Sequence, residues 1–129
     1  MKREISFRGK PVDNGQWLEG SLIGEDVIVG EIVDFDEDYF TTEFWCKVDP
    51  ETVGQFTGRY DKNDKEIFER DIVVNKNIHG KKWIVEYRTD SEYVGFVLKE
   101  IGTNGISLFT SWNDIEVIGN IYDNKELLK

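Results

Sequence analysis

Three aspartates separated by single residues are the most conspicuous chemical feature of this sequence. Asp34, Asp36 and Asp38 have the spacing with which an EF-hand calcium loop begins. That loop needs glycine at its sixth position and glutamate at its twelfth, and this chain has Tyr39 and Trp45 there. We therefore interpret the segment as a solvated acidic turn, and keep cation binding and a partner-facing acidic patch as alternatives.

The other residues with chemical potential are isolated. His79 is the only histidine and Cys46 the only cysteine. A general base needs an orienting group and a nucleophile within reach, and a structural zinc site needs four ligands. The sequence has no Walker loop, dinucleotide fingerprint, nucleophile elbow or zinc-protease helix. We therefore expect no catalytic residue, no metal and no cofactor, and predict that the protein is not an enzyme.

Hydrophobic alternation places one tryptophan in an unusual position. The segment from Tyr39 to Val48 alternates with a period of two, which predicts a strand with Cys46 on its core side and Trp45 on its outer side. Such a tryptophan can pack under a second layer, line a groove or lie in an oligomer interface. The predicted partner surface therefore comprises five residues: Asp34, Asp36, Glu37, Asp38 and Trp45.

The elements that must position these residues are strands. The 129 residues include 12 Val and 13 Ile but only 6 Leu and no Ala, which disfavours helices. Turn signals such as Asn14-Gly15 separate short alternating segments, a pattern typical of a barrel or sandwich. We expect strands near residues 4–8, 17–23, 27–33, 39–48, 53–57, 67–74, 83–88, 94–99, 106–110 and 115–121, and a C-terminal helical turn near 123–128.

Charge and targeting signals narrow the function further. The chain has 26 acidic and 16 basic residues, for a net charge of −10. Ten of the acids lie between Glu25 and Glu51, where Lys47 is the only base. This disfavours a nucleic-acid binder that depends on phosphate neutralisation. No apolar segment is long enough for a signal peptide or a membrane span, and the single cysteine fits a reducing compartment, so we expect a cytoplasmic protein without membrane contact.

Three stretches together resemble the YopX family, which is found mainly in bacteriophages, prophages and mobile elements. The first runs from Phe7-Arg8-Gly9-Lys10 to Glu19-Gly20, and the second from Gln55-Phe56-Thr57-Gly58 to Asp71-Ile72-Val73. The third is the end of the chain, from Ile115 to Leu128. Two positions depart from the family pattern, since Asp64 and Arg70 stand where glycine is usual. Aspartate tolerates a positive φ, whereas Arg70 leaves open whether the backbone keeps one there.

The resemblance implies a mainly β fold over residues 1–129, with a strand-rich acidic part over 1–60 and a small SH3-like β-barrel over 61–129. It also implies a phage or prophage context, but it supplies no mechanism and no site residues. We expect an accessory protein that binds a host or phage protein, with homo-oligomerisation open. The alternatives are a nucleic-acid-associated small barrel, in which Lys76, Lys81, Lys82 and Arg88 meet an exposed aromatic residue, and an acidic DNA mimic.

Overall fold

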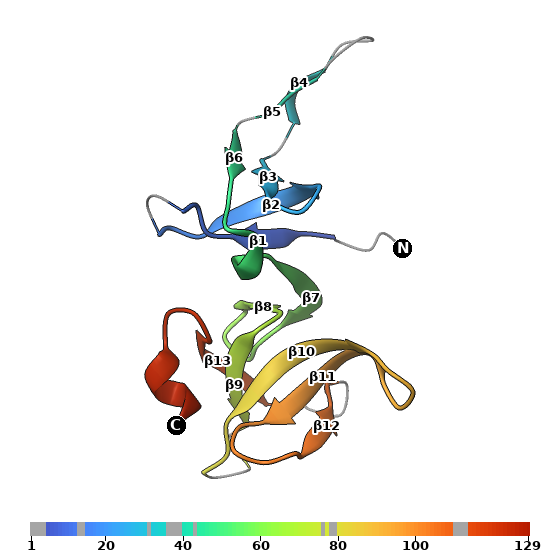
Figure 1. Cartoon of the computed structure of the whole chain (residues 1–129), viewed down its shortest axis with the longest axis vertical. Coiled ribbons are helices and arrows are strands. Elements are labelled where there is room, and N and C mark those ends of the chain that lie inside the picture. Colours follow the sequence, from blue (N-terminus) through green and yellow to red (C-terminus); the bar gives the residue numbers. More distant parts are fainter. Residues whose placement is uncertain are drawn as a thin grey trace. The chain divides into compact units, whose positions relative to one another are not determined.

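The computed structural model describes residues 5–12, 15–30, 32–35, 40–42, 44–75, 77, 80–109 and 114–129, and for 32–35 and 40–42 it describes only the strands. The chain divides into two compact units, Met1–Phe56 and Thr57–Lys129. The described elements are β1 (Phe7–Gly9), β2 (Leu18–Ile23), β3 (Val27–Val29), β4 (Ile32–Phe35), β5 (Phe40–Thr42), β6 (Trp45–Lys47), η1 (Pro50–Thr52), β7 (Gly54–Tyr60), β8 (Glu66–Phe68), β9 (Asp71–Asn75), β10 (Trp83–Thr89), β11 (Val94–Glu100), β12 (Ile106–Leu108), β13 (Ile115–Asn120) and η3 (Lys125–Leu128) (Figure 1). The predicted mainly β class is confirmed.

The N-terminal unit is built on an antiparallel sheet in which β6 is the outermost strand and is followed by β3, β2 and β1. The start of β7 pairs with β1, and β7 then runs on into the C-terminal unit. Ile28 and Val48 are completely buried in the N-terminal unit. Gly20 is required where β2 meets β3, because a Cβ at that position would lie 2.0 Å from the Val29 carbonyl oxygen.

The segment predicted as one strand over 39–48 is instead two strands with different partners. β5 pairs with β4, whereas β6 pairs with β3. In the same way, the predicted strand over 27–33 is divided into β3 and β4. The N–H of Gly30 donates to the Phe44 carbonyl between the two ladders, over 2.9 Å. A hydrophobic period of two is the same on both sides of such an interruption, so it does not reveal the change of partner.

The C-terminal unit contains the five-stranded antiparallel sheet β12-β11-β10-β9-β13, with β8 hydrogen-bonded to β7. The small SH3-like barrel predicted for this part of the chain is not closed in this sheet, and β12 and β13 are its outer strands. The β9–β13 register shifts between Val117 and Gly119, which marks a bulge and places Ile118 at the surface. No helix in the described part of the chain is long and apolar enough to cross a membrane.

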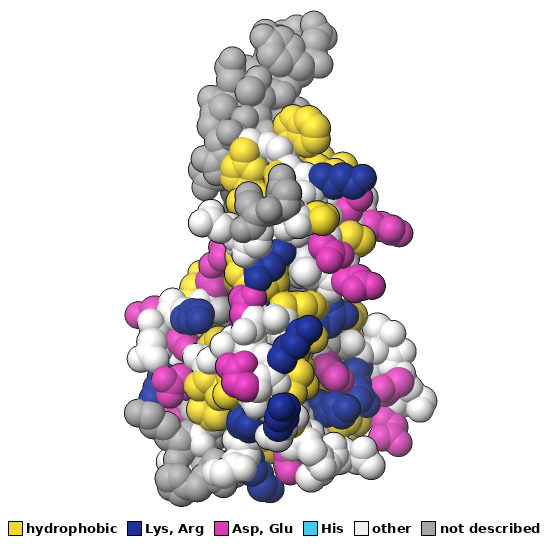
Figure 2. All heavy atoms as spheres, turned by 60° about the vertical axis from the view of Figure 1, so that its left-hand side comes forward, with side chains coloured by type: hydrophobic (Ala, Val, Ile, Leu, Met, Phe, Trp, Pro, Cys, Tyr) yellow, Lys and Arg dark blue, Asp and Glu magenta, His cyan; other side chains and the backbone are white. Residues whose placement is uncertain are grey.

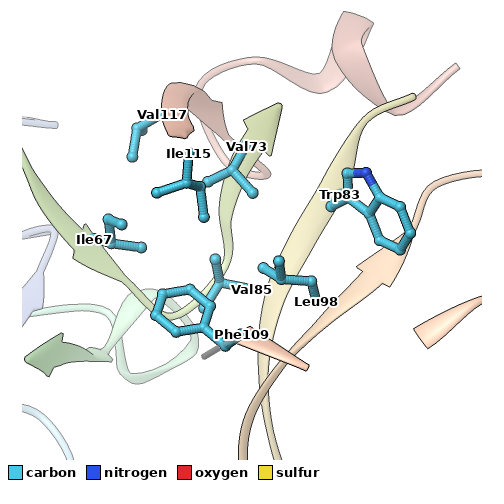
Figure 3. Packing of buried hydrophobic residues seen from close by; sticks show 8 residues of the cluster. All are labelled: Ile67, Val73, Trp83, Val85, Leu98, Phe109, Ile115 and Val117. Carbon is cyan, nitrogen blue, oxygen red and sulfur yellow. The ribbon is translucent and has the colours of Figure 1, made fainter. Parts of the chain in front are cut away.

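Eight buried side chains form the core of this unit (Figure 3). They are Ile67, Val73, Trp83, Val85, Leu98, Phe109, Ile115 and Val117. Alternation explains half of them, because the inward residues Trp83 and Val85 of β10 and Ile115 and Val117 of β13 are two positions apart. Burial of these side chains supplies the hydrophobic stabilisation that a chain of this size needs.

A two-residue turn divides the predicted strand over 67–74 into β8 and β9. Arg70 has a φ of 69°, so it adopts the left-handed conformation that glycine usually supplies. Its N–H donates to the Val85 carbonyl over 2.7 Å, and its carbonyl accepts the N–H of Ile121 over 3.1 Å. These two bonds hold the turn closely between neighbouring segments. Asp64 likewise takes a positive φ of 63°, as expected for an aspartate replacing glycine in a turn.

Candidate partner-binding surface

Trp45 is the largest of the exposed hydrophobic side chains in the described part of the N-terminal unit. It lies in β6, the outermost strand of the sheet, and 71% of its surface is exposed. Alternation predicted its outward orientation correctly. Tryptophan normally buries much of its ring. The exposure of Trp45 is therefore a stronger indication of a binding surface than an exposed leucine or valine would be.

The residues around Trp45 extend it into an apolar face. Directly opposite residues of antiparallel strands have side chains on the same side of the sheet. Trp45 faces Val29, Lys47 faces Val27, and Val27 faces Ile23 on β2. Ile23 is 54% exposed, whereas the two valines are half-buried. We call these five residues the Trp45 face: Ile23, Val27, Val29, Trp45 and Lys47.

Charged groups lie around this face rather than within it, apart from one lysine. The Lys47 ammonium lies 3.7 Å from an Asp26 carboxylate oxygen, and the neighbouring Glu25 is exposed. Figure 2 shows hydrophobic side chains of the N-terminal unit at the surface with acidic side chains beside them. A surface ion pair of this kind contributes little to stability, so Lys47 can exchange its partner at small cost.

The predicted acidic part of the partner surface falls largely outside the described structure. Asp34 lies in β4, and its side chain is outside the description. Asp36, Glu37 and Asp38 lie outside the described residues. Of the five predicted surface residues, Trp45 is therefore the one whose side chain can be placed. The neighbours Ile23, Val27 and Val29 were missed, because strand pairing and not local sequence brings them beside it.

Trp17, by contrast, is packed against cations of its own unit. The Arg8 guanidinium lies 4.5 Å from the Trp17 ring centroid, and the Lys10 ammonium lies 5.2 Å from it. Arg8 itself is buried. Cation–π contacts of this kind are stabilising at such distances. This explains Trp17 as a structural residue, in contrast to Trp45.

The described residues do not assemble a metal-binding group. Among them, no three His, Cys, Asp or Glu side chains come close enough to hold a metal ion. Alternation placed Cys46 on the core side of its strand, but its side chain is only partly buried, and its thiol lies 3.5 Å from the Lys47 carbonyl oxygen. His79 lies outside the described residues.

An open depression of about 150 Å³ lies on the C-terminal unit. Its lining combines two carboxylates, a guanidinium and a phenol: Glu69, Arg70, Glu86 and Tyr87. Arg70 donates to the Tyr122 hydroxyl over 2.9 Å, and Glu86 accepts from Arg88 over 3.2 Å. Two of the lining groups are therefore engaged with neighbours. The sequence did not predict this depression, because Arg70 was assigned to a strand.

The lysines and arginine of the predicted basic cluster are also engaged. Lys81 lies 3.4 Å from Glu100, and Arg88 contacts both Glu86 and Asp90. Lys82 donates to the Lys129 carbonyl over 3.3 Å. Lys76 lies outside the described residues. The three described cations thus each have an acceptor within the protein.

Residues of the family-like stretch from Gln55 to Val73 have structural roles in the C-terminal unit. The Asp61 carboxylate accepts the N–H groups of Asn63, Lys65 and Val117 at 2.8, 2.9 and 3.0 Å. Burial alone would raise the pKa of Asp61. The backbone hydrogen bonds, helped by the Lys65 charge, nevertheless bring this pKa below its usual 3.8. Asp61 therefore fastens the turn between β7 and β8 to β13.

The family-like stretch at the end of the chain, from Ile115 to Leu128, also contains residues that hold a turn. The Asn124 side-chain oxygen accepts the N–H of Asn120 over 3.1 Å, and a Cβ on Gly119 would lie 2.5 Å from that oxygen. Asn120 in turn accepts the N–H groups of Tyr122 and Asp123. These contacts form the turn before η3, which confirms the expected C-terminal helical turn. This stretch of the sequence therefore encodes a turn and a close backbone approach.

Comparisons with known proteins agree with this architecture. The sequence model of the family described as YopX protein matches residues 6–129. The crystal structure of protein EF1440 from Enterococcus faecalis is similar, with a TM-score of 0.65 and 24% identity over 99% of this chain and 100% of that chain. At this identity the likeness shows the fold. No curated protein matches the chain.

Proposed function

This chain belongs to the YopX family, and from that premise we propose that it acts by binding a protein partner, not by catalysis, and that the Trp45 face makes the contact. The observation that carries this proposal is the 71% exposure of Trp45 on an outermost strand, beside Ile23 at 54%. Tryptophan is enriched among the residues that dominate the energy of protein interfaces. An apolar face with charged surroundings has the anatomy of an interface core and rim.

The biological context proposed for this binding is taken from the family resemblance. We assign the chain as a phage- or prophage-encoded accessory protein that works in the bacterial cytoplasm on a host or phage protein. A non-catalytic role is supported by the described residues, in which a turn accounts for Asp61, a buried carboxylate with a lowered pKa. Perturbed carboxylates often mark catalytic sites, but this one serves a turn.

The nucleic-acid alternative has weaker support. It requires a basic groove with an exposed aromatic residue. Lys81, Lys82 and Arg88 instead contact acceptors within the C-terminal unit, and acidic residues are in excess over the whole chain. Strong phosphate binding would have to overcome that negative field. The DNA-mimic alternative needs rows of carboxylates, and the side chains of most acids between Glu25 and Glu51 lie outside the described part of the structure.

Position-specific photo-crosslinking in the producing cells tests the proposal. A benzophenone amino acid is placed at Ile23, within the Trp45 face, and as a control at Leu108, which is 56% exposed on the C-terminal unit. We expect Ile23 to give a discrete crosslinked partner, identified by mass spectrometry, and Leu108 to give none. Equal adducts from both positions, or none from Ile23, would refute the assignment of the face.

A further inference from the structure

At two residues of β6, the backbone N–H and carbonyl groups point toward an open edge of the sheet. The N–H of Gly30 donates to the Phe44 carbonyl over 2.9 Å, and the N–H of Val48 donates to the Asp26 carbonyl over 2.8 Å. In an antiparallel ladder, the backbone groups of successive residues point alternately to the two sides of the strand. The groups of Phe44 and Val48 point to β3, so those of Trp45 and Lys47 point away from it.

No further strand follows on that side within the described residues. The sheet order begins with β6, and β3 is its one neighbour in the described sheet. The outer side of β6 therefore presents an N–H and a carbonyl from Trp45 and the same pair from Lys47. Of these four groups, the Lys47 carbonyl has a weak contact with the Cys46 thiol, at 3.5 Å. Such an edge is a template for pairing with another chain.

The side chains of the same two residues stand beside this edge. Trp45 is 71% exposed, and the Lys47 side chain is 75% exposed. A strand added at the edge would place its own side chains next to the Trp45 ring on the same face of the sheet. Strand addition thus combines backbone hydrogen bonds for affinity with an aromatic contact for specificity.

The charge of the N-terminal unit restricts the chemistry of the added strand. Residues 1–56 contain 13 acidic and 5 basic residues, for a net charge of −8. Three of those bases are described, and each has a partner in its own unit: Arg8 and Lys10 lie over Trp17, and Lys47 pairs with Asp26. A basic segment is attracted by this field, whereas an acidic one is repelled.

We propose that the occupant of this edge is an extended, basic segment of a partner protein, with alternating apolar and Lys or Arg residues, which adds to β6 as an extra strand. The inference rests on the proposed function and specifies how the Trp45 face is used. The apolar side chains of the partner segment pack on Trp45, and its Lys or Arg side chains meet the acidic residues of the N-terminal unit. The competing explanation is that Lys47 simply guards the edge against aggregation, as lysines on edge strands do.

The test uses the full chain and a synthetic probe, an acetylated and amidated six-residue peptide of alternating valine and lysine. Binding is followed by the NMR amide signals of Trp45 and Lys47. Two comparison peptides are matched: one is N-methylated at alternate residues, which removes the donors of one edge, and one has glutamate in place of lysine. We expect the first peptide to shift both amides and to bind about tenfold or more tightly than either comparison.

A pair of variants tests the backbone directly. Lys47→Pro removes the outward N–H, and the matched Lys47→Gln removes the charge but keeps that N–H. We expect the proline variant to bind the valine–lysine peptide about tenfold more weakly than the glutamine variant. An unchanged amide signal from Ile28, which pairs with Cys46, verifies that the β3–β6 ladder is intact.

Three results would overturn the proposal of a basic partner segment added to β6. Absence of any shift at Trp45 and Lys47 with the valine–lysine peptide is one, and equal binding of the N-methylated peptide is another. The third is self-association of the chain that Lys47→Pro abolishes, since the occupant would then be a second copy. The proposed function fails by a separate result, namely crosslinking at Ile23 that yields no partner, so the two failures are distinguishable.

Discussion

The backbone N–H of Val117 donates a hydrogen bond to the Asp61 carboxylate over 3.0 Å, and so joins the turn after β7 to β13 across 56 positions of sequence. Two more N–H groups from the turn itself bind the other oxygen of the same carboxylate. A single buried acid therefore holds together segments that the sequence separates widely. The place of this aspartate in the family-like stretch from Gln55 to Val73 is thus explained by folding.

Replacing this carboxylate with an amide should destabilise the protein. Asp61→Asn weakens three hydrogen bonds and brings an NH₂ group toward backbone donors, so we expect a loss of about 1–3 kcal/mol in the free energy of unfolding at pH 7. The matched control is Asp64→Asn, which changes an exposed turn residue whose positive φ suits asparagine. Urea unfolding followed by tryptophan fluorescence measures both variants. Equal stability of the two would contradict the role of Asp61.

The same carboxylate predicts a pH dependence of definite sign. The pKa of Asp61 is lower in the folded protein than its usual 3.8. Its contribution to stability is therefore fully present above about pH 4 and is lost as the pH falls through the folded value. The stability difference between wild type and Asp61→Asn should shrink between pH 7 and about pH 3. A difference that is constant or grows on acidification would show that another group is responsible.

Substitutions of Arg70 measure the free energy that a side chain costs in the left-handed backbone conformation. Arg70→Gly and Arg70→Ala both remove the contact with the Tyr122 hydroxyl, and they differ only by a Cβ at a φ of 69°. We expect the glycine variant to be more stable than the alanine variant by about 1 kcal/mol. Thermal unfolding measures the difference, and Tyr122→Phe gives the cost of the lost contact alone. An alanine variant as stable as the glycine variant would mean that the turn relaxes.

The close approach between Gly119 and Asn124 predicts a coupled pair of substitutions. A Cβ at 119 would overlap the Asn124 side chain, so Gly119→Ala should cost about 1–3 kcal/mol in the wild-type background. In an Asn124→Ala background the overlap is smaller, and the same substitution should cost about 1 kcal/mol less. A double-mutant cycle by urea unfolding measures this coupling. Additive effects would show that the two side chains do not meet.

The sequence predicted the β class and most strand positions because alternation and turn residues are local signals. β10, β11 and β13 were found within one or two residues of their observed ends. Local signals could not show that β5 and β6 have different partners, because a period of two says nothing about pairing. The sequence left open whether Arg70 has a positive φ, and the structure shows that it does, with backbone hydrogen bonds to Val85 and Ile121 on either side of the residue.

The candidate site was predictable only in part. Alternation identified Trp45 as an outward residue, but it could not select Val29 and Ile23 as its neighbours, since β2–β3 and β3–β6 pairing brings them together. It also could not show that β6 is the outermost strand. Exposure of an aromatic residue depends on what the rest of the chain leaves uncovered, which is a tertiary property.

The affinity of the crosslinked partner for a Trp45 variant tests the central claim most directly. The partner identified through Ile23 is purified and titrated with wild type, Trp45→Ser and, as a control, Leu108→Ser. If the Trp45 face makes the contact, Trp45→Ser raises Kd by about thirtyfold or more, and Leu108→Ser leaves it within about twofold. A Trp45→Ser variant that binds as tightly as wild type would contradict the account.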